Sequence, residues 1–321
     1  MKSSSVKIGA LNISPPVFLA PMAGLTHSAL RQLILDFGGV GLLSTEMLSA
    51  ARIQNEDPKI SPYLIITKRE HPISYQFLIY RADHVKKAVY KAEELGADAI
   101  DINLGCGAPK VRKKGGGIGL ASDFKRLEEI IKEIKKHTKL PVTAKIRIGK
   151  ELNPKKFIAN CQFLENIGID AIYIHARLEK EPFCRPAKWS FVSCLAGEIN
   201  IPYIINGGIF SIDDAKKAQN ESKADGIMIG RAAAIRPWIF KEIELGKAIK
   251  VNLPEIFFKF VDYLKNLFPE DRRLGRLKEF THYFSKNYAF GNRLAMAVQR
   301  SSSMEEALDV AEEFFRKNEK L

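Results

Sequence analysis

The sequence lacks any apolar run long enough to cross a membrane. Its longest apolar stretches, such as Val40 to Leu43 and Gly226 to Ile229, have the length of a strand, whereas a membrane helix needs about 18 apolar residues. The segment Met1 to Lys7 holds three serines and two lysines in place of the apolar core of a secretory signal. We therefore expect a protein with no membrane span and no secretion signal.

Cysteine is scarce and is not arranged for metal binding. The four cysteines, Cys106, Cys161, Cys184 and Cys194, form no C-x-x-C pair and have no histidine cluster near them. This spacing disfavours a zinc site or a disulfide framework and indicates a reducing, cytoplasmic compartment. Polar low-complexity sequence is also absent, and 46% of the residues are hydrophobic, so we expect the chain to be folded throughout.

The charge is strongly positive, and it is concentrated in two segments. The formal net charge is +13, which serves either solubility or an anionic partner. The first segment holds Lys110, Arg112, Lys113 and Lys114. In the second, seven basic residues face one acid, Glu279, and two tyrosines are interleaved with them; the basic residues are Arg272, Arg273, Arg276, Lys278, Lys286, Arg293 and Arg300. A solvated helix face explains either segment alone, but together they favour a phosphate clamp for nucleic acid.

The first three quarters of the chain alternate short apolar runs with amphipathic stretches, which is typical of a parallel β/α protein. The candidate strands are Val17–Ala20, Val40–Ser44, Ile73–Phe77, Ala99–Ile102, Val142–Ile146, Ala171–Ile174, Tyr203–Ile205 and Gly226–Ile229. The clearer helical patterns are Leu30–Phe37, Asp83–Leu95, Phe124–His137, Pro154–Ile167 and Ile212–Gln219. Eight strands fit a (β/α)8 TIM barrel. A doubly wound sheet is the alternative, but no G-x-G-x-x-G motif follows the first strand.

A helix begins near Pro237 after the last strand, and from about Asn252 the strand signals stop. Apolar residues then recur at helical spacing in Ile256–Phe268, Leu277–Tyr288 and Met304–Phe315, which predicts a small all-helical domain. We place the barrel in residues 1–245 and the helical domain in residues 246–321. Ser211 is predicted to cap one helix, and Ser303 with Glu306 to form a capping box for the last helix.

Polar or glycine residues follow nearly every predicted strand. They are Pro21-Met22-Ala23-Gly24, Glu46, Gln76, Asn103, Lys145, His175, Asn206-Gly207-Gly208 and Gly230-Arg231. In a TIM barrel these strand ends meet on one face, where the active site is built. The glycines and Arg231 after the last two strands suit a phosphate group. Lys145 would stabilise a reduced, anionic flavin ring, unless it pairs with Glu46 across the barrel.

The loop after the fourth strand carries a cysteine between glycines, Gly105-Cys106-Gly107, and runs into the cations Lys110 to Lys114. A cysteine in such a loop is exposed, and its thiol can give up a proton as a general acid. A nucleophilic role needs a base, and no base lies nearby in the sequence. An ordinary loop cysteine is the alternative. Cys161, within a helical pattern, is expected in the core.

At these residues the sequence resembles the tRNA-dihydrouridine synthase family. The matching stretches, in the family's order, are Ala20 to Gly24, Thr45-Glu46-Met47, Asp101 to Cys106 with Pro109-Lys110-Val111, Lys145-Ile146-Arg147, Ile174 to Arg177, Asn206 to Ile209 and Ile229-Gly230-Arg231 through Trp238. The departures are Gly107 in place of a common proline, Ala176 and Ala232 in place of glycines, and Leu178 in place of a threonine. None of them removes a catalytic group.

The resemblance implies FMN as cofactor, NADPH as reductant and a tRNA uridine as substrate. It implies that hydride passes from the flavin to uracil C6 while Cys106 protonates C5, and that Asn103 and Arg177 hold the uracil edge. The implied FMN residues are Pro21, Met22, Ala23, Gln76, Lys145, His175, Asn206, Gly207, Gly208, Gly230 and Arg231. The two basic segments would bind tRNA, and we expect a monomer without an obligate protein partner.

Two other interpretations remain open at this point. A flavin barrel that acts on a free pyrimidine explains the polar strand ends equally well, but gives the basic helices no role. A non-catalytic RNA-binding protein explains the basic helices, but does not explain why Cys106, Lys145 and His175 are all present. The position of the target uridine in tRNA is not encoded in the barrel motifs.

Overall fold

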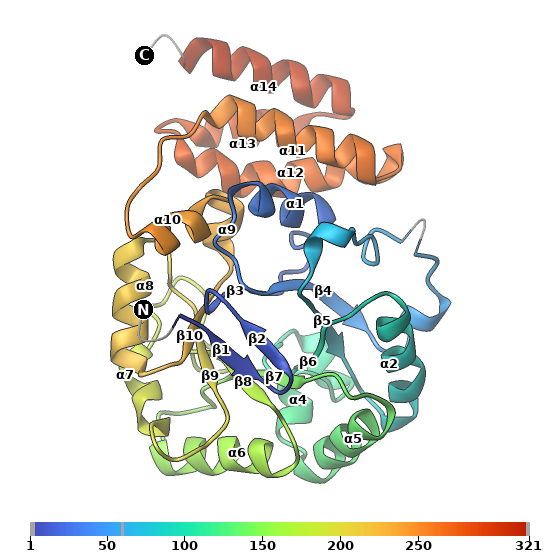
Figure 1. Ribbon diagram of the computed structural model, residues 1–321. Helices are drawn as coiled ribbons and strands as arrows, with labels where there is room; N and C mark the ends of the chain where they lie inside the picture. The colour runs from blue at the N-terminus through green and yellow to red at the C-terminus, as the bar shows by residue number, and fades with distance from the viewer. Residues whose placement is uncertain (1–3, 59–60, 319–321) are drawn as a thin grey trace.

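The computed structural model describes residues 4–58 and 61–318. Eight parallel strands form one sheet in the order β3-β10-β9-β8-β7-β6-β5-β4, and a bridge between Phe18 and Leu42 links its two ends into a barrel. The strands are β3 (Val17–Leu19), β4 (Leu43–Ser49), β5 (Ile73–Leu78), β6 (Ala99–Asn103), β7 (Val142–Arg147), β8 (Ala171–His175), β9 (Tyr203–Asn206) and β10 (Gly226–Ile229). The predicted TIM barrel is confirmed (Figure 1).

The eight predicted strands all form, and the largest difference in bounds is at β4. The sequence predicted Val40–Ser44, whereas the strand runs from Leu43 to Ser49. Its pairing with β5 shifts register between Ser44 and Met47. A bulge interrupts the regular alternation of side chains between the two faces of a strand, so the alternation pattern does not predict the bounds of β4. Thr45 and Glu46 lie in this irregular stretch.

Helices cover the outside of the barrel because each has one apolar stripe that packs on the strands. The long ones are α1 (Ser28–Phe37), α2 (Val85–Glu94), α5 (Phe124–His137), α6 (Pro154–Asn166) and α8 (Ile212–Ser222). The predicted Ser211 cap is confirmed, since its hydroxyl accepts a hydrogen bond from the Asp214 amide at 3.0 Å. The helix expected to begin near Pro237 is α10 (Ile239–Leu245), and a short helix that the sequence did not predict, α9 (Arg231–Ile235), precedes it. Pro237 lies in the break, and proline cannot donate the helical hydrogen bond.

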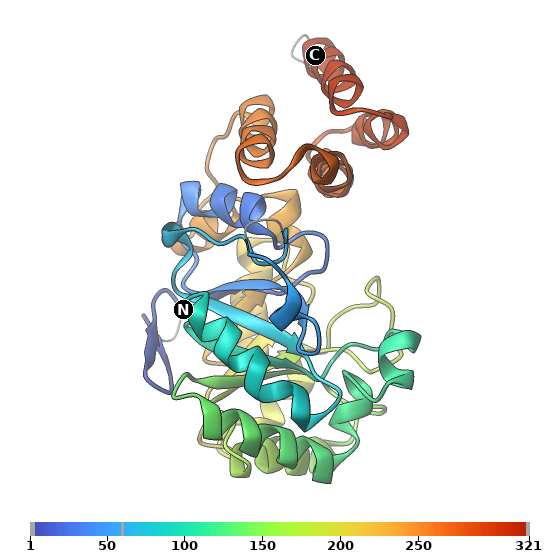
Figure 2. The ribbon, with the colours of Figure 1, turned by 90° about the vertical axis from the view of Figure 1, so that its right-hand side faces the viewer.

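A short hairpin that the sequence did not predict closes one end of the barrel. Its strands β1 (Val6–Ile8) and β2 (Leu11–Ile13) pair antiparallel, and Val6, Ile8 and Ile13 pack with Phe18 and Tyr173 inside the barrel. Figure 2 shows the hairpin on the side of the barrel opposite the loop that carries α3 (Pro109–Lys113) and α4 (Ile118–Ala121). The carboxyl ends of the strands therefore open on the other side.

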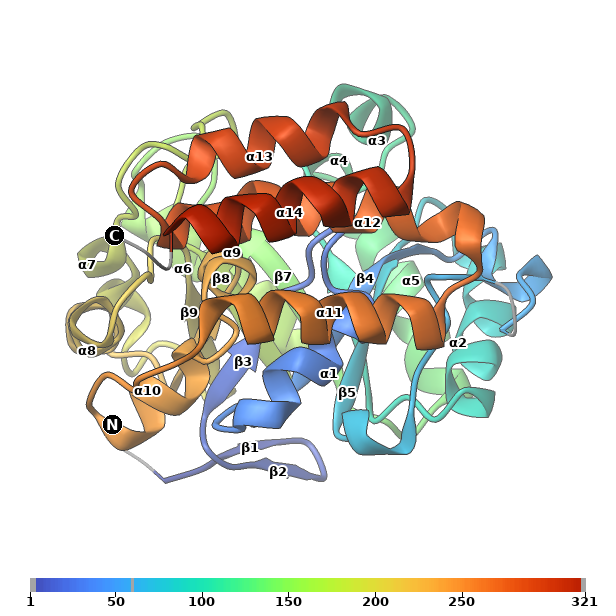
Figure 3. The same cartoon turned by 90° about the horizontal axis from the view of Figure 1, so that it is seen from above.

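The chain after Asn252 forms four helices, α11 (Leu253–Leu267), α12 (Arg273–Phe284), α13 (Gly291–Arg300) and α14 (Met304–Asn318). The sequence predicted three of them and missed α13, whose buried face consists of Gly291, Leu294 and Val298 alone. Phenylalanines of α11, α12 and α14 form their core. From above, α11 lies over α1 (Figure 3). No helix among the described residues is long and apolar enough to span a membrane.

The cap of α14 differs from the expected capping box. Ser303 accepts a hydrogen bond from the Glu306 amide at 3.1 Å, as predicted. The Glu306 carboxylate, however, accepts from the amide and hydroxyl of Ser302, at 2.6 and 2.8 Å, so the reciprocal contact predicted for Ser303 is wrong by one residue. Ser302 offers the carboxylate two donors, its backbone amide and its hydroxyl, whereas the predicted capping box offers only the amide of Ser303.

Candidate active site

A cavity of about 420 Å³ opens at the carboxyl ends of the barrel strands. It is lined by all the residues that the sequence assigned to catalysis, to FMN and to the uracil edge. These residues lie at the carboxyl ends of different strands or in the loops that follow them, and they meet only in the fold. They are Pro21, Met22, Ala23, Gln76, Asn103, Cys106, Lys145, His175, Arg177, Asn206, Gly207, Gly208, Gly230 and Arg231. This convergence follows from parallel strands, whose carboxyl ends share one face.

A chain of buried amides and one carboxylate forms part of the cavity floor. The Gln76 side-chain amide donates to Asp101 at 2.6 Å, and Thr143 donates to the same carboxylate at 2.7 Å. Asn103 in turn donates to the Gln76 side-chain oxygen at 2.8 Å. Burial raises the pKa of Asp101 to about 6, against the opposing effect of these hydrogen bonds. The network fixes which face of Gln76 is free to meet a ligand.

Lys145 lies beside this network and is bound to Asn206. Its ammonium donates to the Asn206 side-chain oxygen at 3.0 Å, and the Asn206 amide donates to the Met228 carbonyl at 2.7 Å. Burial lowers the pKa of Lys145 to about 8, although Asp101 acts to raise it. The alternative pairing with Glu46 is not seen, because Glu46 accepts from the Gly24 amide at 2.6 Å instead.

His175 is held as a neutral ring. Burial and the neighbouring cations Lys145, Arg147, Arg177 and Arg231 lower its pKa to about 2. Its Nε2 lies 2.9 Å from Nη1 of Arg177; since a guanidinium can only donate, Nε2 accepts and the proton sits on Nδ1. A neutral imidazole here offers a ligand one donor without adding to the positive charge.

The turn after β9 brings its backbone close to the ring of His175. Gly207 and Gly208 have φ angles of +105° and +75°, which favour glycine. A Cβ on Gly207 would lie 2.6 Å from Cδ2 of His175, so no larger residue fits. Trp189 donates to the Gly207 carbonyl at 2.8 Å and fixes the turn. Across the cavity, the Arg231 guanidinium lies 5.6 Å from the Phe183 ring centroid and 5.3 Å from that of Phe210.

Asn103 holds the cysteine loop in place. Its side-chain oxygen accepts from the amides of Gly105 and Cys106, at 3.2 and 2.9 Å. The Cys106 carbonyl accepts from Ile118 at 3.1 Å, and Gly117 (φ +56°) packs so closely on it that a Cβ would lie 2.3 Å away. The Cys106 thiol is half-buried at the cavity, whereas Cys161 lies in the core as expected.

Several cavity residues were missed by sequence reasoning. Arg147 donates to the carbonyls of Leu178, Glu179 and Glu181 at 2.7 to 3.3 Å and so fixes the loop after β8. That loop presents Phe183, which is 56% exposed and stacks on His175 with 5.7 Å between ring centroids. Glu279 and Tyr283 of α12 also line the cavity. Arg147 stood in a quoted motif, and Glu279 stood out as the one acid of the basic segment, but no signal in the sequence placed Phe183, Glu279 or Tyr283 at the cavity.

The basic residues occupy two kinds of position. Lys110, Arg112, Lys113 and Lys114 on and after α3 are exposed, as are Arg272, Lys286 and Arg293. Lys278 is half-buried, and so are Arg273 and Arg276, which are bound within the chain. Arg273 donates to the Phe268 carbonyl at 2.7 Å, and Arg276 lies 4.8 Å from the Phe268 ring centroid. The exposed group is the better placed to meet phosphates.

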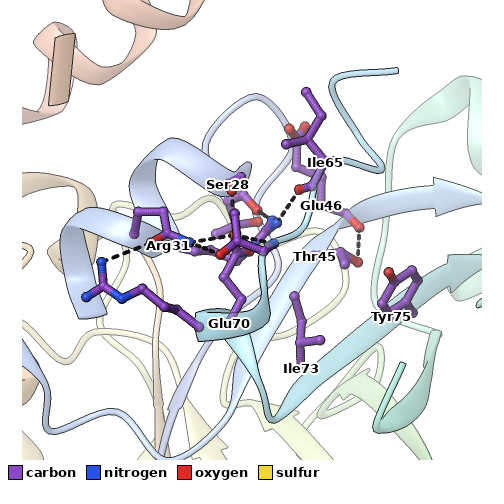
Figure 4. A network of polar contacts seen from close by, with 12 residues as sticks. Ser28, Arg31, Thr45, Glu46, Ile65, Glu70, Ile73 and Tyr75 are labelled. Carbon is purple, nitrogen blue, oxygen red and sulfur yellow. Dashed lines mark hydrogen bonds and ion pairs between the residues drawn. The ribbon is translucent and has the colours of Figure 1, made fainter. Parts of the chain in front are cut away.

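The loop between β3 and α1 lines the cavity with Pro21, Met22 and Ala23, and a buried ion pair, shown in Figure 4, supports this loop. Arg31 and Glu70, both fully buried, are ion-paired, and Glu70 also accepts from Ser28 and Gln32. Arg31 donates to the Thr26 carbonyl. The Thr26 hydroxyl in turn accepts from the Met22 amide at 3.0 Å, which links the ion pair to the lining of the cavity.

Comparisons with known proteins show the family to which the chain belongs. Residues 18–318 match the family model described as dihydrouridine synthase. The probable tRNA-dihydrouridine synthase of Aquifex aeolicus is 37% identical over 289 residues, 88% of this chain and 85% of that protein. The tRNA-dihydrouridine synthase B of Pseudomonas syringae is 34% identical over 241 residues, 75% of this chain and 71% of that protein.

Solved structures support the fold alone. The old yellow enzyme homologue from Zymomonas mobilis superposes with a TM-score of 0.56 at 12% identity, over 78% of this chain and 94% of that one. The 2-naphthoyl-CoA reductase complex has a TM-score of 0.59 at 13% identity, over 76% of this chain and 52% of that one. The family match over nearly the whole chain, with its motif residues gathered around one cavity, confirms the resemblance: the chain belongs to the dihydrouridine synthase family.

Proposed function

We propose that the protein reduces uridines in tRNA to dihydrouridine, with FMN as cofactor and NADPH as reductant. The observation that carries the proposal is the convergence of Cys106, Lys145, His175 and the glycine turns on one cavity, in a chain that also carries exposed cations on α3 and at Arg272, Lys286 and Arg293. A free-pyrimidine reductase needs the first of these features but not the second. Residues 246–321 would then serve to bind tRNA.

The cavity residues suit FMN. Gly207, Gly208 and Gly230 line the cavity, where glycine lets backbone N–H groups approach a phosphate, and Arg231 supplies a cation on the same cavity. Lys145 places its ammonium among Gln76, Asn206 and His175, at the ring end of the cavity. When bound, FMN supplies the hydride that is added to C6 of the uracil.

Cys106 supplies the proton for C5 in this proposal, so that one hydride and one proton saturate the C5–C6 bond. The thiol stands at the cavity on a loop fixed by Asn103 and Gly117, which holds it in one orientation. Arg147 lines the same cavity and is close enough to interact electrostatically with Cys106. Asn103 and Arg177 hold the uracil edge.

The test is an absorption spectrum of the purified protein, followed by NADPH under anaerobic conditions and then by unmodified tRNA. We expect flavin bands that bleach with NADPH and recover when tRNA is added, with dihydrouridine found by mass spectrometry of the digested RNA. Recovery with uracil or orotate in place of tRNA would support the free-pyrimidine interpretation. A protein that binds no flavin under any condition would overturn the proposal.

A Cys106→Ala variant tests the acid separately. It should bleach with NADPH like the wild type but fail to recover with tRNA, because hydride transfer lacks its proton. Cys194→Ala is the matched control, since Cys194 is half-buried and is not among the residues that line the cavity. If Cys106→Ala turns over at the wild-type rate, Cys106 is not the acid.

A further inference from the structure

Glu279 stands at the rim of the cavity but belongs to α12, outside the barrel. A Cβ built on Gly24 would lie 3.8 Å from Cγ of Glu279, so its side chain reaches the loop that follows β3. Tyr283, one helical turn further along, lines the same cavity. The helix therefore presents two consecutive turns to the space where the substrate must enter.

The negative charge of Glu279 contrasts with the positive charge of the other ionised side chains that line this cavity. Among the described residues that line it, Glu279 is the one acid, against the cations Lys145, Arg147, Arg177 and Arg231. No hydrogen bond or ion pair to its exposed carboxylate is found among residues 4–58 and 61–318. A bare carboxylate at the mouth repels the phosphates of RNA, unless it accepts a hydrogen bond from the substrate itself.

A uridine within an RNA chain has two donors to offer, the N3–H of the base and the 2′-hydroxyl of the ribose, because its other sugar oxygens are esterified or in the ring. The base must enter first, since Cys106 and the nearly buried Arg177 lie inside the cavity. This order leaves the ribose at the rim, where the exposed Glu279 stands. Carboxylates bind ribose hydroxyls in the same way in dinucleotide sites.

We propose that Glu279 accepts a hydrogen bond from the ribose 2′-hydroxyl of the uridine that enters the cavity, and so makes the enzyme select RNA over DNA. The inference rests on the proposed function. It gives the lone acid of the basic segment a role, and it makes α12 a part of the active site as well as of the tRNA-binding surface. The 2′-hydroxyl is the group by which a protein distinguishes RNA from DNA.

The test uses tRNA assembled by ligation, with one changed sugar at the uridine that the wild type is first shown to modify. The three substrates carry uridine, 2′-deoxyuridine or 2′-fluoro-2′-deoxyuridine, the last of which lacks the donor but keeps an RNA-like sugar pucker. We expect kcat/KM of the wild type to fall about 10- to 100-fold without the hydroxyl, as for one charge-assisted hydrogen bond. Glu279→Ala should process all three alike, at the rate of the wild type on the deoxy substrate.

Two further variants sharpen the result. Glu279→Gln keeps an acceptor but not the charge, and should discriminate by an intermediate factor. Glu312→Ala removes an exposed acid of α14 that is not among the residues lining the cavity, and should discriminate like the wild type. Equal ribose preference in the wild type and Glu279→Ala would overturn the inference while leaving the proposed function intact. If the wild type binds flavin and is bleached by NADPH but forms no dihydrouridine, both fall together.

Discussion

Removing one partner of the Arg31–Glu70 pair should destabilise the barrel strongly. Both side chains are fully buried, so Glu70→Gln leaves a guanidinium in the core with neutral acceptors, among them the carbonyls of Thr26 and Ile65, and no counter-charge. An uncompensated buried charge of this kind costs about 3–5 kcal/mol. That is a large part of the total stability of about 5–15 kcal/mol that is usual for a folded protein. Arg31→Met should cost a similar amount, because it leaves the carboxylate unpaired.

The assay is urea unfolding followed by circular dichroism, with the double variant Arg31→Met/Glu70→Gln completing the cycle. Because the second change removes the stranded charge, the double variant should be at least about 2 kcal/mol more stable than the sum of the two single losses predicts. The control is the surface pair Lys241–Glu244, joined at 2.7 Å with both side chains 36% exposed. Lys241→Met should cost less than about 1 kcal/mol.

The same variants should weaken FMN binding, since Arg31 holds the Thr26 carbonyl and the Thr26 hydroxyl holds Met22. The reasoning would be refuted if either single variant lost less than about 1 kcal/mol of unfolding free energy, or if the loss in the double variant equalled the sum of the two single losses. That outcome would mean that water enters the site and solvates the remaining charge.

Three further predictions concern the cavity and its surroundings. Gly207→Ala should weaken FMN binding at least tenfold, because its Cβ would meet His175 at 2.6 Å at a φ of +105°; Gly275→Ala in α12, which meets nothing within 4 Å, should bind FMN normally. Because burial lowers the pKa of Lys145 to about 8, its charge is present below that pH and lost above it. Titration of the reduced protein should therefore show FMN affinity falling above pH 8, with no such step in Lys145→Met. Charge reversal at the exposed Arg272, Lys286 and Arg293 should weaken tRNA binding and flatten its salt dependence by about one unit of slope per lost contact, leaving FMN bound; reversal of the exposed Lys216 should change neither.

The sequence was sufficient for the barrel because its strands are short, fully buried and evenly spaced between amphipathic helices. It failed where local geometry departs from regular periods. The bulge in β4 displaced that strand's predicted bounds, and the three-residue strands of the β1–β2 hairpin are too short to show alternation. Helix α13 was missed for a similar reason, because its buried face has too few apolar residues to show a helical period.

Some residues of the candidate site could be predicted from the sequence, and others could not. Residues at strand ends could be predicted to meet, because the topology of a parallel barrel brings them to one face. Arg31 and Glu70 could not, since they are 39 positions apart and neither follows a strand of the predicted barrel. Glu279 was visible in the sequence as the one acid in a basic segment, but the direction in which it points depends on how α12 packs beside α9.

The sequence assigned Arg272, Arg273, Arg276 and Arg293 alike to RNA binding, but they differ in burial. Arg272 and Arg293 are exposed, whereas Arg273 and Arg276 are half-buried and make contacts within the chain. Arg276 was predicted to bind RNA, yet it lies half-buried on Phe268, and burial lowers its pKa while Glu46 acts to raise it. Glu46 and His27 each keep one buried polar atom without a partner among the described residues, and so does Arg276. Buried polar atoms are rarely left unsatisfied, and these three residues lie near one another where α12 meets the barrel. Glu279 and Tyr283 belong to the same helix, so the packing at this junction also sets where α12 places them at the cavity.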